Sequence, residues 1–105
     1  MELYGARYNY FGVRGLRDDE HYKPGDYCRE SKDWDLENDC PSQETLGGTC
    51  AIAVYDSHGN FDEEESIIGA SAYSNRLALI AGDSAYWGYD PDEIVIKNAV
   101  VIKIY

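Results

Sequence analysis

The chain has 105 residues, the length of one ordinary domain, and its 44% apolar residues are enough for one core. Twenty Asp and Glu residues face nine Lys and Arg residues, so the formal net charge at pH 7 is −11. A chain of this charge repels nucleic acid and anionic membrane surfaces, because contacts with phosphates need cations. The charge therefore predicts a basic partner, and it excludes direct binding of nucleic acid or membrane.

The sequence also predicts a soluble, cytoplasmic protein. It contains no run of about 18 apolar residues that could span a membrane. Residues 1–4, "MELY", lack the basic and apolar regions of a secretory signal. Three cysteines are an odd number, so a disulfide framework is not indicated. We expect free thiols in a reducing compartment and no cofactor.

In chain order, the first predicted strand covers residues 2–10, "ELYGARYNY", where tyrosines recur at every second position. Residues 11–48 are interrupted by glycine and proline and predict an acidic, irregular insert. Two continuous apolar runs, "TCAIAVY" at 49–55 and "RLALIAG" at 76–82, are typical of buried strands.

A helix is predicted between these two runs, over residues 60–74, "NFDEEESIIGASAYS". Asn60 or Asp62 can cap it, and acidic residues fill its first turn, where the helix dipole favours them. A thin apolar stripe would face the sheet: Phe61, Ile68 and Ala72. The aromatic stretch 83–92, "DSAYWGYDPD", predicts a loop. Residues 93–105 predict one kinked strand or two short strands.

This order indicates a single α+β domain over residues 1–105. We expect a four- to five-stranded sheet, one main helix packed on a face, and a long acidic irregular insert after the first strand, over about residues 11–48. The helix between two strands permits a right-handed crossover, so a mixed or partly parallel sheet is compatible with the sequence.

Within the insert, "KDWDLENDC" has an acid at every second position: Asp33, Asp35, Glu37 and Asp39. If this segment is extended, its carboxylates lie on one side about 6.6 Å apart, while Trp34 and Leu36 point inward. Repulsion within such a row would be relieved by the cations of a partner. The row can also imitate a phosphate backbone. We therefore predict a surface that binds a basic protein, and a nucleic-acid-binding protein is one such candidate partner.

Two tyrosines of the aromatic loop, Tyr86 and Tyr89, are predicted to be exposed partner contacts, with Trp87 buried as a plug. The leading interpretation is a small acidic inhibitor or binding module. Small phage and mobile-element inhibitors of host defence often share this character: short, acidic and without catalytic signatures.

The same acids allow a calcium interpretation. The segment from Asp33 to Glu44 resembles the calcium loop of EF-hand proteins, with oxygen ligands at positions one, three, five, seven and twelve. The implied ligands are Asp33, Asp35, Glu37, Asp39 and Glu44. The segment departs from that loop at position six, where Asn38 replaces glycine, and at position nine, which is Pro41.

An enzymatic interpretation also remains. The C-terminal stretch "LIAGDSAYWGYDPDEIVIKNAVVIKIY" resembles the last part of mono-ADP-ribosyltransferases, in which an aromatic loop leads into a strand whose first Glu is catalytic. The resemblance implies that Glu93 is this residue and that Arg7, in "LYGARY", is the cation that holds NAD. The alternative is that Glu93 only opens a strand beside a Pro-Asp turn.

Overall fold

The computed structural model describes all residues except 1, 4–5, 30–47 and 89–90. The first two strands, β1 (Glu2–Leu3) and β2 (Ala6–Arg7), pair with each other in a small separate sheet. Six further strands form one antiparallel sheet in the order β6-β7-β4-β3-β5-β8. These are β3 (Tyr10–Gly15), β4 (Thr49–Ile52), β5 (Leu77–Gly82), β6 (Ser84–Trp87), β7 (Glu93–Lys97) and β8 (Val100–Ile104). With the helix α3 (Glu63–Ser71), the class is α+β as predicted, but the sheet has six strands instead of four or five.

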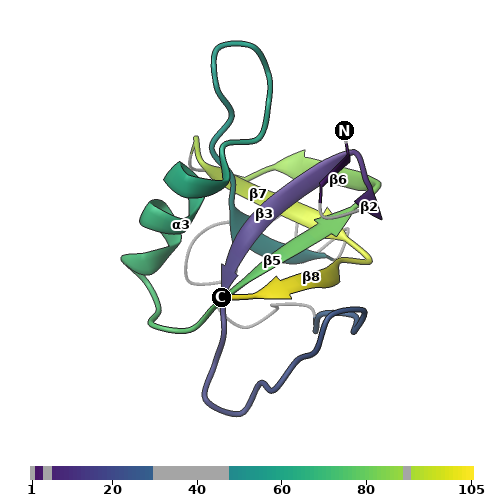
Figure 1. Cartoon of the computed structure of the whole chain (residues 1–105), viewed down its shortest axis with the longest axis vertical. Coiled ribbons are helices and arrows are strands. Elements are labelled where there is room, and N and C mark those ends of the chain that lie inside the picture. The colour runs from purple at the N-terminus through teal and green to yellow at the C-terminus, as the bar shows by residue number, and fades with distance from the viewer. Residues whose placement is uncertain (1, 4–5, 30–47, 89–90) are drawn as a thin grey trace.

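Residues 77–104 form a long antiparallel hairpin that bends in its middle. Only Asp83 separates β5 from β6, and two residues separate β7 from β8. Pairing continues across the bend, because β5 pairs with β8 and β6 pairs with β7. The half of the hairpin formed by β5 and β8 pairs with β3, through β5. The half formed by β6 and β7 pairs with β4, through β7. Since β3 also pairs with β4, the sheet curls back on itself, and β7 crosses behind β3 and β5 in Figure 1.

Two residues make this bend possible. A Cβ atom on Gly82 would lie 2.5 Å from Cγ2 of Ile96, so any larger side chain would collide with the opposite strand. Asn98 has a φ of 51°, in the left-handed region that asparagine tolerates better than most residues. The sequence predicted either one kinked strand or two short strands over 93–105, and the structure contains two.

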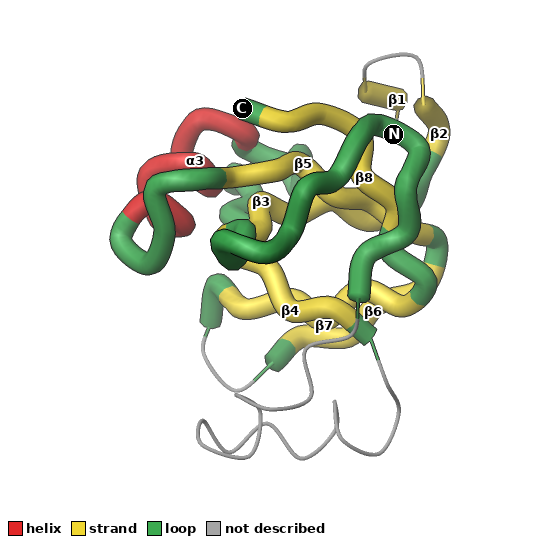
Figure 2. The backbone as a smooth tube through the Cα atoms, turned by 90° about the horizontal axis from the view of Figure 1, so that it is seen from below, coloured by secondary structure: helices red, strands yellow, loops and turns green. Residues whose placement is uncertain are grey.

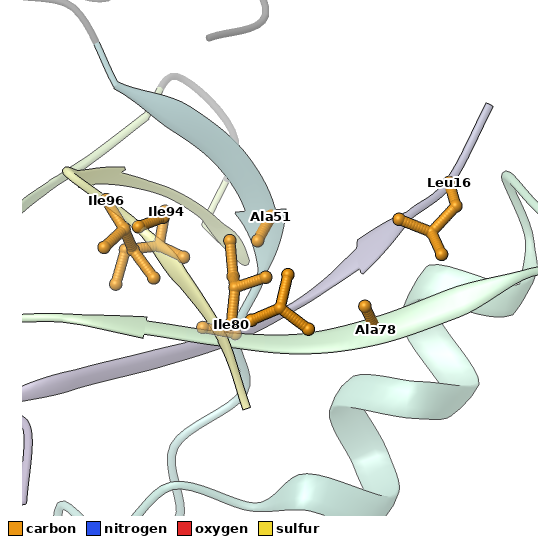
Figure 3. Close-up of a cluster of buried hydrophobic side chains, with 9 residues drawn as sticks. Leu16, Ala51, Ala78, Ile80, Ile94 and Ile96 are labelled. Carbon is orange, nitrogen blue, oxygen red and sulfur yellow. The ribbon is translucent and has the colours of Figure 1, made fainter. Parts of the chain in front are cut away.

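The interior of the curled sheet holds one of its apolar clusters. Side chains from several strands point toward one another there: Leu16, Ala51, Ala78, Ile80, Ile94 and Ile96 (Figure 3). The alternate residues of β5 face the other way, and Leu79 and Ala81 pack in a second cluster with Phe11 and Val13. Because β5 is buried on both faces, its sequence is a continuous apolar run instead of an alternating one.

The helix begins where the sequence predicted. The side chain of Asp62 accepts a hydrogen bond from the backbone N–H of Glu65 at 3.1 Å, which confirms Asp62 as the N-cap. The predicted apolar stripe is only partly correct: Phe61 packs against the core, but Ala72 is exposed. Ile68 is 57% exposed, whereas Ser66 and Ala70 are buried. Ser66 is accommodated because its hydroxyl accepts from the N–H of Val54 and donates to the carbonyl of Asp62. Among the described residues, no helix has the length and apolar character needed to cross a membrane.

The helix links β4 to β5, but these strands are not neighbours. β3 lies between them, and it is antiparallel to both. β4 and β5 therefore run in the same direction, as in a crossover, while every strand pair in the sheet is antiparallel. The expected mixed or parallel pairing is wrong because a third strand fills the space between the two that the helix connects. Figure 1 shows α3 beside β3 and β4.

Two segments were assigned incorrectly from the sequence. The predicted first strand over 2–10 and the irregular insert from residue 11 both miss β3, which runs through Phe11 to Gly15 at the centre of the sheet. Gly12 suggested a turn, but it is needed because a Cβ there would lie 2.7 Å from Cβ of Ala51. Residues 83–92, predicted as a loop, contain the edge strand β6.

The two isoleucines Ile80 and Ile68 offer a direct test of this packing. Ile80 is fully buried, so Ile80→Ala should lower the free energy of unfolding by about 2–5 kcal/mol. The same truncation at exposed Ile68 should change it by less than about 0.5 kcal/mol. Urea denaturation followed by circular dichroism measures both. A larger loss at Ile68 would contradict the orientation of α3.

Candidate functional site

The predicted carboxylate row lies outside the described residues: Asp33, Asp35, Glu37 and Asp39. The same is true of Glu44 and Tyr89. The partner-binding row and the calcium loop therefore stay predictions. The structure does describe the residues on either side of 30–47. The hydroxyl of Thr49, in β4, donates to the carbonyl oxygen of Arg29 at 3.2 Å. The residues that flank 30–47 are thus held side by side.

The two described aromatic residues of β6 are arranged opposite to the prediction. Tyr86 is half-buried against Cys50 and Val95, on the outer face of the sheet. Trp87 is 50% exposed, and its ring meets the ring of Tyr55 edge-on with the centroids 5.6 Å apart. Trp87 is therefore no plug, because it lies at the end of an edge strand where no further strand covers it among the described residues.

Glu93 and Arg7 were proposed as a pair by the resemblance to ADP-ribosyltransferases. Glu93 is the first residue of β7 and is buried, with its side chain against Gly88. Gly88 also donates its N–H to the carbonyl oxygen of Glu93 at 2.8 Å. Arg7 belongs to β2 in the small separate sheet. The two residues thus come from different sheets, and packing against Gly88 accounts for the burial of Glu93.

Within the described part of the chain, no group of three or more His, Cys, Asp and Glu residues is arranged to hold a metal ion. Cys28 and Cys50 are free thiols. Burial raises the pKa of the Cys28 thiol to about 11. Since the thiolate is the reactive form, Cys28 is a poor nucleophile at neutral pH.

A buried ion pair stands at the end of β3. The guanidinium of Arg14 donates to both carboxylate oxygens of Glu20, at 2.8 and 2.9 Å. Their side chains are only 6% and 3% exposed. The Glu20 carboxylate also accepts from the backbone N–H of Arg17 and the hydroxyl of Tyr22, and Arg29 approaches it at 3.3 Å. Such a bidentate, multiply bonded pair compensates for the cost of burying both charges.

This pair fixes residues 16–29 on the sheet. Arg76, at the start of β5, donates to the carbonyl oxygens of Arg17 and Glu20, at 2.8 and 2.7 Å. At the other end of the segment, Cys28 donates its N–H to Ala99 and Val101 donates to Asp26. This network could not be predicted from the sequence, because Glu20 lies beyond the end of β3 and no local motif relates it to Arg14.

The environment of Glu20 changes its acidity. Burial alone would raise the pKa of the carboxyl group. Hydrogen bonds from Arg14, from the N–H of Arg17 and from Tyr22, with the charge of Arg14, outweigh burial and lower the pKa from 4.5 to about 2. The carboxylate therefore stays ionised in the folded protein down to strongly acid pH.

A groove of about 980 Å³ opens where β3 and β4 separate. The two strands are in register at one position, Val13 with Ile52, and diverge beyond it. The floor is apolar and includes Val13, Ala51, Ile52 and Ala70. Tyr73, just past the end of α3, lines one side and is 80% exposed. Three acids also line the groove: Asp18, Asp92 and Glu93.

The described arginines differ in their surroundings. Arg14 is buried against Glu20, and Arg76 reaches two carbonyl oxygens. Arg29 approaches Glu20 and Asp19 with a side chain that is 50% exposed, and Arg17 is exposed too. Several acids are exposed: Asp18, Asp56, Glu64, Glu65, Asp83 and Asp92.

Comparison with known proteins finds no matching family model, no matching curated protein and no matching solved structure.

The ion pair predicts an uneven response to two neutralising substitutions. Glu20→Gln leaves Arg14 charged and buried, so it should lower the free energy of unfolding by about 3–5 kcal/mol. Asp19→Asn removes a carboxylate that is exposed and 3.7 Å from Arg29, and should cost less than about 1 kcal/mol. Chemical denaturation at pH 7 measures both values. Equal losses would show that Glu20 is not the stronger anchor.

The lowered pKa of Glu20 predicts acid sensitivity. The folded-state pKa is about 2 and the usual value is 4.5, so the carboxylate contributes its full stability above pH 4.5. This contribution is lost as the pH falls from 4.5 toward 2, because the unfolded chain binds the proton first. Urea midpoints measured across this range should fall less steeply for Glu20→Gln than for the natural sequence. Parallel curves would contradict the assignment.

Proposed function

We propose that this protein acts by binding a basic protein surface, to which it presents carboxylates and tyrosines. The observation that carries the proposal is the direction of its own cations. Arg14 is buried against Glu20 and Arg76 is bonded to backbone carbonyl oxygens, on a chain of net charge −11 that carries several exposed acids. Such a surface attracts a cationic partner over distance and disfavours acidic ones.

The proposed contacts are the carboxylate row and two tyrosines: Asp33, Asp35, Glu37, Asp39, Tyr86 and Tyr89. The described fold supports placing part of this set together. Arg29 and Thr49 meet at the base of segment 30–47, and Thr49 is next to Cys50, against which Tyr86 packs. The chain therefore leaves and rejoins the sheet beside Tyr86. Figure 2 shows β4, β7 and β6 adjacent at this side of the molecule.

A partner that itself binds nucleic acid fits this proposal best, because its binding channel already holds cations spaced for phosphates. A row of carboxylates on a folded base would occupy that channel and block it. This mode of action is that of an inhibitor, of the kind that phages and mobile elements direct against host defence. Such a protein needs no cofactor.

The test compares two triple substitutions with the same change of charge. Asp33→Lys, Asp35→Lys and Glu37→Lys together should weaken binding of a partner captured from the source cell by more than about tenfold. The control variant combines Glu64→Lys, Glu65→Lys and Asp83→Lys, three exposed acids outside the insert, and should weaken it by less than about threefold. Binding of the natural protein should also fall steeply between about 0.05 and 0.5 M salt.

Circular dichroism confirms that each variant is folded before binding is measured. If both triple variants lose affinity equally, net charge alone explains binding and the proposed contacts are wrong. If neither the salt nor the insert substitutions change binding, the electrostatic proposal itself fails.

A further inference from the structure

We infer that the groove between β3, β4 and the end of α3 binds an extended partner segment that carries Lys or Arg beside apolar side chains. This inference rests on the proposed function, because it names part of the partner that the function requires. The residues that carry it are all described ones, and none of them belongs to the carboxylate row.

The groove is bounded by close packing of the backbone. A Cβ on Gly15 would lie 2.7 Å from Cβ of Ser74, and a Cβ on Gly69 would lie 3.0 Å from Cγ2 of Ile52. Glycine at these two positions lets the end of α3 approach the diverging strands closely. The volume of about 980 Å³ is at the upper end of the usual range for ligand sites, about 300–1,000 Å³. There is therefore room for several side chains, more than a single cation would fill.

The floor determines the apolar part of the occupant. Val13, Ala51 and Ala70 are buried, and Ile52 is half-buried, so the bottom of the groove offers no charge. Tyr73 stands at the edge with 80% of its surface exposed, and it is the kind of residue that becomes a hot spot when a partner covers it. An apolar side chain placed between Tyr73 and the floor would be removed from water on both sides.

The charges determine the polar part. Asp18 and Asp92 are exposed at the groove, whereas Glu93 is buried against Gly88. The bases among the described lining residues are Arg14 and Arg17, and the guanidinium of Arg14 is bound by Glu20. Acidic groups therefore outnumber available cations, so a segment with Lys or Arg is favoured and an acidic segment is repelled.

The test titrates the ¹⁵N-labelled full chain with three blocked pentapeptides and follows its amide resonances. Leu-Lys-Leu-Lys-Leu should give saturable shifts centred on residues 13–18, 50–52 and 69–74. Ser-Lys-Ser-Lys-Ser lacks the apolar side chains and Leu-Glu-Leu-Glu-Leu reverses the charge, so each should bind at least about tenfold more weakly. Tyr73→Ala, and separately Asp18→Lys with Asp92→Lys, should weaken the first peptide by about tenfold.

Matched controls are Tyr27→Ala and Asp83→Lys. Tyr27 is also largely exposed, at 72%, and both residues border a separate small hollow with Lys97 and Asn98. Neither control should change peptide affinity by more than about twofold. The spectra themselves show whether each variant is folded.

The inference is overturned if the shifts do not saturate, if they follow exposed acids over the whole surface, or if the serine peptide binds equally well. Loss of affinity in the controls would overturn it too. If the peptides do not bind the groove but a partner still binds in a salt-dependent way, the proposed function is unaffected. Saturable binding of the leucine–lysine peptide without any salt-dependent partner would remove the proposed function and keep the groove as a binding site.

Discussion

The structure depends on the bend shared by β5–β6 and β7–β8. Without it, residues 77–104 would form a straight hairpin whose two halves lie in one plane. With it, one half pairs with β3 and the other with β4, so the sheet encloses its own core (Figure 1). Gly82 permits the bend because the strands approach too closely for a side chain, and Asn98 permits it through its positive φ. This geometry also buries both faces of β5 and most of β7.

The bend has consequences at the surface. A curled sheet leaves β3 and β4 paired at one end and separate at the other, and the separation opens the groove beside α3. The ion pair of Arg14 and Glu20 lies at this end and holds residues 16–29 in place. A charged pair is suited to this position, because its bidentate geometry specifies one arrangement of an otherwise irregular segment. It withdraws one cation and one carboxylate from the surface together, so the net charge of the exterior is unchanged.

The function proposed here follows from this distribution of charge. The acids of the chain are spread over the insert, the start of α3 and the turns, whereas three arginines are used to hold the fold together. The hydrogen bond between Thr49 and Arg29 brings the base of the acidic insert next to Tyr86, which joins the sequence-derived contacts to the described fold.

The sequence by itself determined the features that depend on neighbouring residues. Asp62 was identifiable as a helix cap, the apolar runs within 49–55 and 76–82 as strands, and the net charge as strongly negative. These features are local or additive, so they can be read without knowing what packs where. The carboxylate row of Asp33 to Asp39 was also proposed from sequence, and it stays a prediction.

Only the tertiary structure decided which residues face one another. β3 was missed because Gly12 suggests a turn until Ala51 is seen against it. Ile68 was placed inside the helix interface and Trp87 inside the core, yet both are exposed, because α3 and the edge strand β6 are each covered on one side only among the described residues. Arg14 and Glu20 were not paired from the sequence, since β3 ends at Gly15 and the chain beyond it has no regular structure that would place Glu20. Long-range contacts of this kind depend on how the sheet bends, and the bend is fixed by packing between segments distant in the chain.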